Sequence, residues 1–370
     1  MTSAAMLRAV IVGFVLCSVG AATAAAPKTR IIVVDSYHPE YLWSQDTQAG
    51  VVAALLEHGY LDDESQADEY SRLDYVESST AIVKKLWMDT KRKNARQDLQ
   101  ESIARVVQEI DRFAPDLVLL GDDNATNYIG SQYVDTDIPV VFWGVNGNPL
   151  AYHLLDSLEA PGHNVTGVYQ AGYLREGVIW LKRRLPELRT IAVLSDESET
   201  GRVKAKELAR LARQGELPVT IVDIVVTDSW SRWKARALEL QPKVDAFFVL
   251  NHNTLRDDEG RLVDQMDAGA WYLRHIHRPD VSHERHFVLE GMLCAVDDSG
   301  YKQGYEAMQI GHRIVSGGEA PAAIPVRAPE RGAFVVNLQR AADLGLDTRI
   351  AASPLIEERI DKAMALQGFR

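Results

Sequence analysis

The chain has 370 residues, of which 46% are hydrophobic and 25% are charged, and its formal net charge at pH 7 is −12. This length suits two domains, and the composition is that of a soluble globular protein. A chain this acidic is poorly suited to binding nucleic acid or an anionic membrane over a broad surface, so we expect no nucleic-acid partner.

The first 26 residues have the organisation of a secretory signal peptide. Met1–Arg8 contains one cation, and Ala9–Val19 is an apolar run of about eleven residues, too short for a stable membrane anchor. Small residues at Ala22, Ala24 and Ala26 fit the cleavage rule. We predict a signal peptide over residues 1–26, cleaved near Ala24 or Ala26, and a periplasmic or secreted mature protein. An uncleaved membrane anchor is the alternative.

The first half of the chain predicts alternating strands and helices. Thr29–Asp35 is a short β-branched run typical of a buried parallel strand. Residues 62–74 are acidic and break the pattern, and Lys91–Lys93 is expected to be a solvated turn. The predicted strands are 29–35, 73–77, 116–121, 138–145 and 164–168, and the predicted helices are about 44–58, two helices within 79–113, and 125–134.

The second half repeats this scheme, with helices between short apolar runs. The predicted strands are 190–195, 219–226, 245–250, 285–290 and 334–338. The predicted helices are 173–184, 202–214, 230–240, 261–277, 300–316, 339–344 and 352–368.

The alternation of strand and helix implies parallel sheets, and we predict an α/β fold with two Rossmann-like lobes. Residues 138–168 are interpreted as the first crossing of a hinge between the lobes, although an ordinary β-α-β connection fits the pattern equally well. The predicted division is a first lobe of 27–145 and 295–324, a second lobe of 146–294 and 325–345, and a C-terminal helix at 346–370.

Polar and aromatic residues follow several of the predicted strands, where parallel sheets bind their ligands. These clusters are 36–43, 122–124, 146–149, 195–200 and 251–254. Tyr37, Tyr41 and Trp43 offer rings for stacking on a flat ligand, unless Trp43 packs under its own loop. The carboxylates of Asp122, Asp123 and Asp196 can accept an ammonium group or cap a helix.

No catalytic or metal-binding motif is evident. The histidines at 275, 277, 283 and 286 lack the spacing of a metal site, and no HExxH, GxSxG or phosphate loop occurs. The acidic runs at 62–64 and 257–259 lack the pattern of a calcium loop. After signal cleavage Cys294 is the one remaining cysteine, which excludes an intramolecular disulfide. We therefore expect no catalytic residues, no metal and no cofactor.

Two segments resemble a known family. PVVFWGVNGNP at 139–149 and APGHNVTGV at 160–168 are similar to segments of the substrate-binding proteins of bacterial ABC transporters, in the group that includes tryptophan binders. Residues 245–254, Pro325 with 334–338, and 341–345 add to the resemblance, which extends from about Ile31 to Asp347.

The resemblance implies a type I periplasmic binding protein, with a three-crossing hinge near 143–166, 292–298 and 325–327 and a ligand trapped between the lobes. It implies that a monomer captures a small molecule, aromatic or amino-acid-like, and delivers it to an ABC permease. With the aromatic residues above, the predicted ligand-binding residues are Ser36, Tyr37, Tyr41, Trp43, Asp122, Asn146, Ser195, Asp196, Asn251, Asn253, Glu290 and Asp298.

The sequence also departs from the family pattern. Asn146 begins a turn where many members have an acidic residue, and Asn251-His252-Asn253 replaces the Thr-Asp-Asn of tryptophan binders. These changes remove acids that would recognise the ammonium of an amino acid. The Ser36–Trp43 opening resembles a branch found beside sensor kinases and cyclic-dinucleotide enzymes, which implies a sensing subunit docking on a kinase ectodomain as an alternative. A secreted α/β enzyme using the same cleft is a third possibility.

Overall fold

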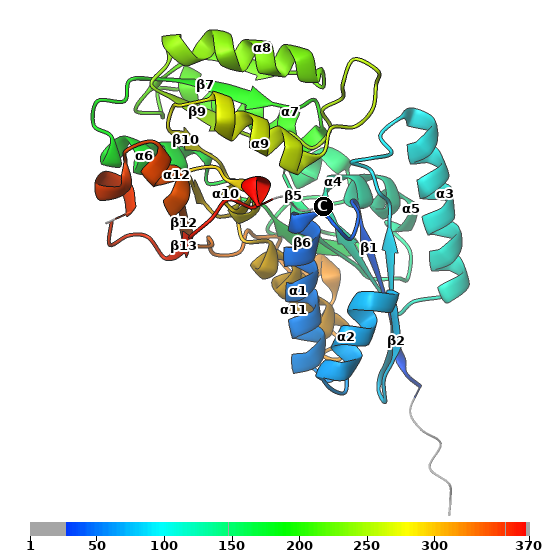
Figure 1. Ribbon diagram of the computed structural model, residues 1–370. Coiled ribbons are helices and arrows are strands. Elements are labelled where there is room, and N and C mark those ends of the chain that lie inside the picture. Colours follow the sequence, from blue (N-terminus) through cyan, green and yellow to red (C-terminus); the bar gives the residue numbers. More distant parts are fainter. Residues whose placement is uncertain (1–26, 147, 352, 368–370) are drawn as a thin grey trace, which may run out of the picture.

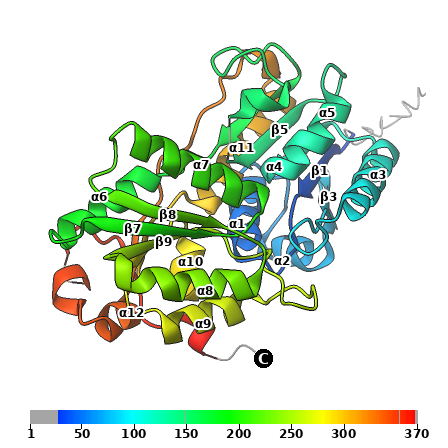
Figure 2. The ribbon, with the colours of Figure 1, turned by 90° about the horizontal axis from the view of Figure 1, so that it is seen from above.

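The computed structural model describes residues 27–146, 148–351 and 353–367, so the predicted signal peptide lies outside the described residues. Two α/β lobes lie side by side, each built on its own sheet (Figures 1 and 2). This arrangement confirms the predicted fold class. No helix among the described residues is long and apolar enough to cross a membrane.

The first lobe contains a six-stranded sheet in the order β2-β3-β1-β4-β5-β6. The β2–β3 pair is antiparallel, and all the other pairs are parallel. The central residues of β1, Ile31 to Val34, are fully buried because helices cover both faces of the sheet. The strands are β1 (Thr29–Asp35), β2 (Tyr75–Glu77), β3 (Ala81–Trp87), β4 (Leu117–Gly121), β5 (Val140–Val145) and β6 (Val165–Tyr169).

Helices from both ends of the chain cover this sheet. One apolar cluster joins the sheet to α1 and α11, and another joins it to α3 on the opposite face. The helices of this lobe are α1 (Leu42–Glu57), α2 (Glu64–Leu73), α3 (Arg96–Phe113), α4 (Asp122–Asn124), a π-helical turn (Ala125–Ile129), α5 (Gly130–Tyr133), a 3-10 turn (Pro149–Tyr152) and α11 (Gly300–Val315).

Two predictions for the first lobe are wrong. The acidic segment 62–74 contains α2, which Asp63 caps through its side chain. The segment 79–113 is not two helices, because β3 occupies its first part and pairs with β1. The two lysines of β3 interrupt its apolar pattern and pair with acids elsewhere in the lobe: Lys84 pairs with Glu109, and Lys85 with Asp74.

The second lobe contains a parallel four-stranded sheet in the order β10-β9-β7-β8, and a smaller sheet in the order β11-β12-β13. Its strands are β7 (Thr190–Ser195), β8 (Thr220–Val226), β9 (Ala246–Val249), β10 (Asp280–Val281), β11 (Cys294–Val296), β12 (Phe334–Asn337) and β13 (Glu358–Ile360). Its helices include α6 (Leu174–Arg184), α7 (Glu199–Arg213), α8 (Trp230–Leu240), α9 (Gln265–His275), α10 (Arg285–Glu290) and α12 (Leu338–Asp343).

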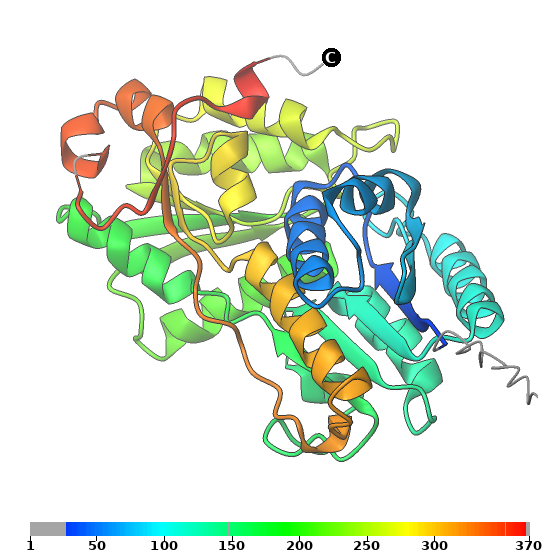
Figure 3. The ribbon, with the colours of Figure 1, turned by 90° about the horizontal axis from the view of Figure 1, so that it is seen from below.

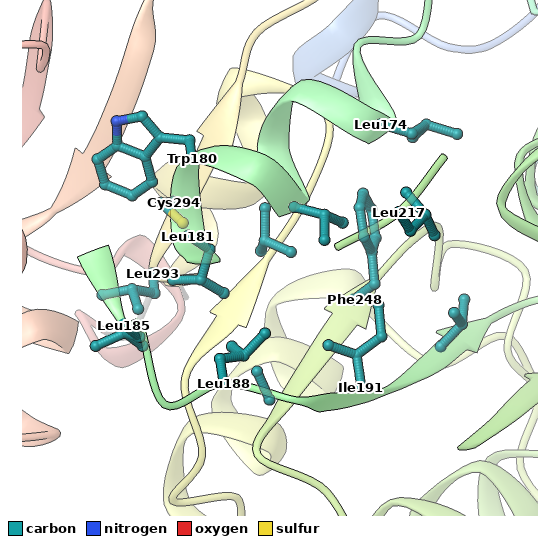
Figure 4. Packing of buried hydrophobic residues seen from close by; sticks show 14 of the residues in the cluster. Leu174, Trp180, Leu181, Leu185, Leu188, Ile191, Leu217, Phe248, Leu293 and Cys294 are labelled. Carbon is teal, nitrogen blue, oxygen red and sulfur yellow. The ribbon is translucent and has the colours of Figure 1, made fainter. Parts of the chain in front are cut away.

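The two sheets of this lobe share a hydrophobic core. Leu181 of α6, Phe248 of β9 and Leu293 before β11 pack in one buried cluster (Figure 4). Cys294 lies in the same cluster with a free thiol and is 1% exposed, as predicted for a small buried hydrophobic residue.

Two predictions for the second lobe are wrong. The segment 285–290 forms helix α10 and not a strand. The predicted C-terminal helix is absent from the described part of the tail, where β13 pairs with β12 and a short 3-10 turn follows at Met364–Leu366. Glu358 of β13 forms an ion pair with Arg285, which attaches the tail to α10.

The chain passes between the lobes at residues 170–173, 297–299 and 324–333. The first crossing follows β6, which belongs to the first sheet, and so lies later than the predicted 143–166. The third returns from α11 to the small sheet (Figure 3). The Gly172 amide donates to Asp298 across 2.7 Å, which bonds the first two crossings together. Arg327 of the third crossing forms a bridge with Val168 of β6, just before the first. On this evidence we propose that the lobe boundary follows Tyr169.

Replacing Gly304 with alanine should destabilise the pair formed by α1 and α11. A Cβ at this position would lie 2.0 Å from the carbonyl oxygen of Thr47, which the rigid backbone of α1 cannot avoid. We expect the free energy of unfolding to fall by about 1–3 kcal/mol, measured by chemical denaturation.

Gly269→Ala in α9 is the matched control, because its new Cβ would meet its nearest neighbour at 3.3 Å. This variant should be close to neutral, since alanine also favours the helix. Equal losses for the two variants would contradict the close helix contact.

Candidate functional site

The carboxyl ends of the strands in the two lobes face each other, and side chains from these ends touch across the interface. The Asn253 side-chain amide donates to the Tyr41 hydroxyl at 2.7 Å. Thr200 Oγ1 lies 3.4 Å from the Tyr37 hydroxyl and 3.5 Å from Asn146 Nδ2. The structure therefore brings loops that follow β1, β5, β7 and β9 into one interlobe site.

The aromatic loop after β1 fills the middle of this site. The rings of Tyr37 and Tyr41 meet edge to face at 5.2 Å, and both are almost fully buried. Trp43 donates its indole N–H to Asp122 at 2.8 Å, which fixes its ring against the end of β4. Ser36 is directed inward: its hydroxyl donates to Gly121 O at 2.5 Å and accepts from the Ala125 amide. Ser36 thus stabilises the loop itself.

Two aspartates at the end of β4 have different surroundings. Asp123 accepts hydrogen bonds from Asn146 and from the Tyr152 hydroxyl, so its oxygens are occupied. Asp122 has a left-handed backbone, with φ of 67°, and its Oδ2 is buried without a partner among the described residues. Burial, with the charges of Asp35 and Asp123, raises the pKa of Asp122 well above its usual value.

The second lobe contributes the ends of β7 and β9. Asp196 accepts from the backbone amides of Asn253 and Thr254 at 2.7 and 3.1 Å, and so holds the loop after β9 in place. Ser195 Oγ, Asn251 Oδ1 and Asn253 Oδ1 are buried and have no partner in the described part of the chain. Each of these oxygens therefore has unused hydrogen-bonding capacity at the interface.

A buried cluster of histidine and glutamate lies behind Tyr41. His252 Nε2 contacts Glu290 at 2.7 Å, and the His286 ring meets the Tyr41 ring at 5.5 Å. Burial raises the pKa of Glu290, and it lowers the pKa of His286 to about 3. Glu290 Oε1 and His286 Nε2 have no hydrogen-bond partner among the described residues.

The crossings also reach the site. Burial raises the pKa of Asp298 to about 6, although the positive charge of Lys204 partly offsets this rise. Lys204 donates to Gln170 at 2.9 Å and lies 3.7 Å from Glu284. No group of three or more His, Cys, Asp and Glu side chains in the described ranges is arranged to hold a metal ion.

Most residues of the predicted site lie in or next to this interface, but their roles differ. Ser36 and Asp196 stabilise loops, whereas Asp122, Asn146 and Asn253 keep a buried oxygen without a partner in the described protein. Thr200 and His252 lie in the polar clusters predicted at strand ends but were not among the predicted ligand-binding residues. The interface residues that were not predicted at all are Lys91, Lys204, Glu284 and His286. Their local sequence offered no signal, because each becomes part of the site through tertiary contacts.

A cavity of about 380 Å³ opens beside Tyr37 on the side of α3 and α7. Both lobes contribute to its wall, with Lys91 and Asp123 on one side and Arg202 and Arg256 on the other. A smaller cavity of about 230 Å³ lies next to Trp43 and His286. The arrangement suits a small polar molecule enclosed between two lobes.

Residues 47–354 match a family model described as ABC transporter substrate binding protein. The chain belongs to this family. The family is one of substrate-binding proteins and not of enzymes. A search of curated proteins gave no significant match to this substrate-binding protein.

Solved structures share its fold. A conserved domain protein from Vibrio cholerae is 17% identical with a TM-score of 0.68, and the match covers 90% of this chain and 100% of that one. An ABC domain from Streptococcus pneumonia in complex with L-Trp is 20% identical with a TM-score of 0.66 over 90% and 100%. The ligand-free, open structure of CD0873 from Clostridium difficile, a substrate binding protein with adhesive properties, is 19% identical with a TM-score of 0.63 over 91% and 100%.

Proposed function

We propose that this substrate-binding protein captures a small organic solute between its two lobes outside the cytoplasm and delivers it, as a monomer, to an ABC permease. The observation that supports this most directly is the set of buried polar atoms without partners at the facing strand ends. Asp122, Asn146 and Asn251 each place one such oxygen in the interface. Leaving a buried polar group unpaired is costly, so a solute that pairs with these atoms gains binding energy.

The mechanism is a shift of population between open and closed states. A solute held by residues of both lobes makes its full set of contacts only when the lobes are closed, so binding favours that state. Bonds between lobes, such as Tyr41 with Asn253, add to the closed state. The hydrogen-bonded crossings provide a narrow hinge about which the lobes can move.

Replacing Asn146 and Asn253 together with alanine should abolish solute binding. Each keeps its Oδ1 buried without a partner in the described chain, and Asn253 also holds the Tyr41 hydroxyl of the opposite lobe. The measurement is native mass spectrometry of the purified mature protein, followed by denaturation to release any bound molecule. The solute found in the wild-type protein should be missing from the double variant, and its addition should no longer raise the melting temperature.

Asn148→Ala is the matched control, because Asn148 is exposed and its side chain only caps a short 3-10 turn. This variant should keep the solute. An unchanged thermal shift in the double variant would contradict the assigned site. If no bound molecule and no stabilising compound were found for the wild-type protein, solute capture itself would be wrong.

A further inference from the structure

Lys91 is an unusual cation within the described structure. Three of the lysines there are buried, namely Lys85, Lys91 and Lys204. Lys85 lies 3.2 Å from Asp74, and Lys204 lies 3.7 Å from Glu284. Lys91 is 3% exposed, and within the described residues its ammonium forms no ion pair within 4.0 Å and no hydrogen bond. The sequence predicts a solvated turn at 91–93, which is correct for Lys93, with 63% of its side chain exposed, but wrong for the buried Lys91.

The Lys91 ammonium forms cation–π contacts with two tyrosine rings. Lys91 Nζ lies 4.4 Å from the centre of the Tyr37 ring and 5.4 Å from that of Tyr41. Aromatic faces stabilise a cation, but they do not replace oxygen acceptors for its three N–H donors. Lys91 also lines the cavity of about 380 Å³, so its ammonium can reach a molecule held there.

A second cation faces the same cavity from the opposite lobe. Arg256 donates to Gly260 O at 3.0 Å and to Asn94 Oδ1 at 2.9 Å, and both acceptors are neutral. No carboxylate among the described residues lies within 4.0 Å of its guanidinium. Each lobe therefore contributes to this cavity one cation without a close counter-ion.

The acids that line the cavity are mostly occupied by protein donors. Asp123 accepts from Asn146 and Tyr152. Asp228 accepts from the Glu197 amide at 2.8 Å and the Thr254 hydroxyl at 2.6 Å, and Glu199 pairs with Arg202 at 3.1 Å. The Glu197 side chain is exposed to solvent. The carboxylates of Asp123 and Asp228 thus have neutral protein donors in place, whereas the Lys91 ammonium has no protein acceptor among the described residues.

We propose that the solute of this protein contains an oxyanion, a carboxylate or a phosphate, which binds between Lys91 and Arg256. This inference rests on the proposed solute-binding function and adds the chemical class of the solute. Charge-assisted hydrogen bonds to an oxyanion satisfy the donors of the Lys91 ammonium. Because the two cations come from different lobes, the oxyanion also favours closure.

The test compares the wild-type protein with Lys91→Met, which removes the charge, and with Lys91→Arg, which keeps it. The control is Lys93→Met, which removes a charge of the same turn outside the cavity. Melting temperatures are measured with inorganic phosphate and with succinate, against sodium chloride of equal ionic strength. Native mass spectrometry measures the solute that copurifies, and ion exchange after denaturation determines its charge. The two probes distinguish a phosphate site from a carboxylate site.

The wild-type protein, Lys91→Arg and Lys93→Met should each give one of two results. Either an acidic solute copurifies with the protein, or one of the two probes raises its melting temperature above the value in sodium chloride. Lys91→Met should bind about thirtyfold more weakly, or worse, since it removes one partner of a buried charge pair. Equal binding by Lys91→Met, or release of a cationic or uncharged solute, would overturn the oxyanion site and leave solute capture intact. Absence of any bound or stabilising compound in all four proteins would overturn both. Melting without probe shows whether each variant is folded.

Discussion

Replacing Arg340 with leucine should lower the free energy of unfolding by about 3–5 kcal/mol, because it leaves a buried carboxylate without its counter-ion. Arg340 of α12 contacts Asp280 of β10 at 2.8 Å, and the two side chains are 2% and 0% exposed. The same guanidinium donates to the carbonyl oxygens of Ile276 and Arg278. The measurement is chemical denaturation at neutral pH, followed by fluorescence.

Arg349→Leu is the matched control for this experiment. Arg349 pairs with Glu187 at 2.7 Å, but the two side chains are 42% and 61% exposed, and exposed pairs contribute about 0–1 kcal/mol. A large loss for Arg340→Leu and a small one for Arg349→Leu would show that the burial of the Arg340–Asp280 pair determines the size of the loss. Losses of similar size would contradict this.

The sequence alone was sufficient to predict the strands whose two faces are both covered by helices. Runs such as Ile31 to Val34 and Leu117 to Leu120 are continuous and apolar, and both are fully buried in parallel sheets. The alternation of these runs with helices was enough to predict two lobes of parallel sheet. The apolar run 138–145 likewise predicted β5, which is Val140–Val145.

The elements that were predicted wrongly are those whose conformation depends on distant partners. The lysine ammonium of β3 that breaks its apolar pattern is stabilised by Asp74 and by the Tyr70 ring at 4.5 Å. In α10, Phe287 and Val288 form an apolar pair that suits either a strand or a helix. The tail becomes a strand only because β12 is there to pair with it. No local pattern contains this information.

In the candidate site, too, local sequence patterns predicted the positions of the loops but not the contacts of their side chains. Loops at strand ends were predicted to gather because parallel sheets place them at one edge, and both lobes do so. Whether a side chain faces the interface depends on rotamers and on the lobe opposite, so Ser36 was predicted to bind ligand although its hydroxyl is occupied within its own loop. Lys91 was missed for the converse reason, since the tyrosine rings that bury it precede it by about fifty residues of chain.

Replacing His283 and His286 together with glutamine should make the protein less sensitive to mild acid. Both rings are buried, and burial lowers the pKa of His283 to about 4 and that of His286 to about 3. Glu284 opposes these shifts, while Lys91, Lys204 and His252 add to them. Between pH 7 and pH 5 the unfolded histidines take up protons and the folded ones do not, so stability falls as the pH falls.

The expected size is about 2 kcal/mol for each histidine between pH 7 and pH 5, taking an unfolded pKa of about 6.5. The quantity to measure is the difference in unfolding free energy between the wild-type protein and the double variant at several pH values. As the pH falls, the unfolding free energy of the wild-type protein should decrease more than that of the double variant. The range stops at pH 5 because carboxylates in the unfolded chain begin to titrate below it.

His163→Gln is the control, for which the pH dependence of the stability change should have the opposite sign. Its imidazole lies 2.6 Å from Asp135, and this hydrogen bond raises the pKa of His163. A raised histidine pKa gives stability that is fully present below the unfolded pKa and is lost as the pH rises through the folded value. Removing His163 should therefore cost more at pH 5 than at pH 8. A flat difference for the buried pair would mean that the interlobe cluster admits protons in the folded state, which contradicts its burial behind Tyr41.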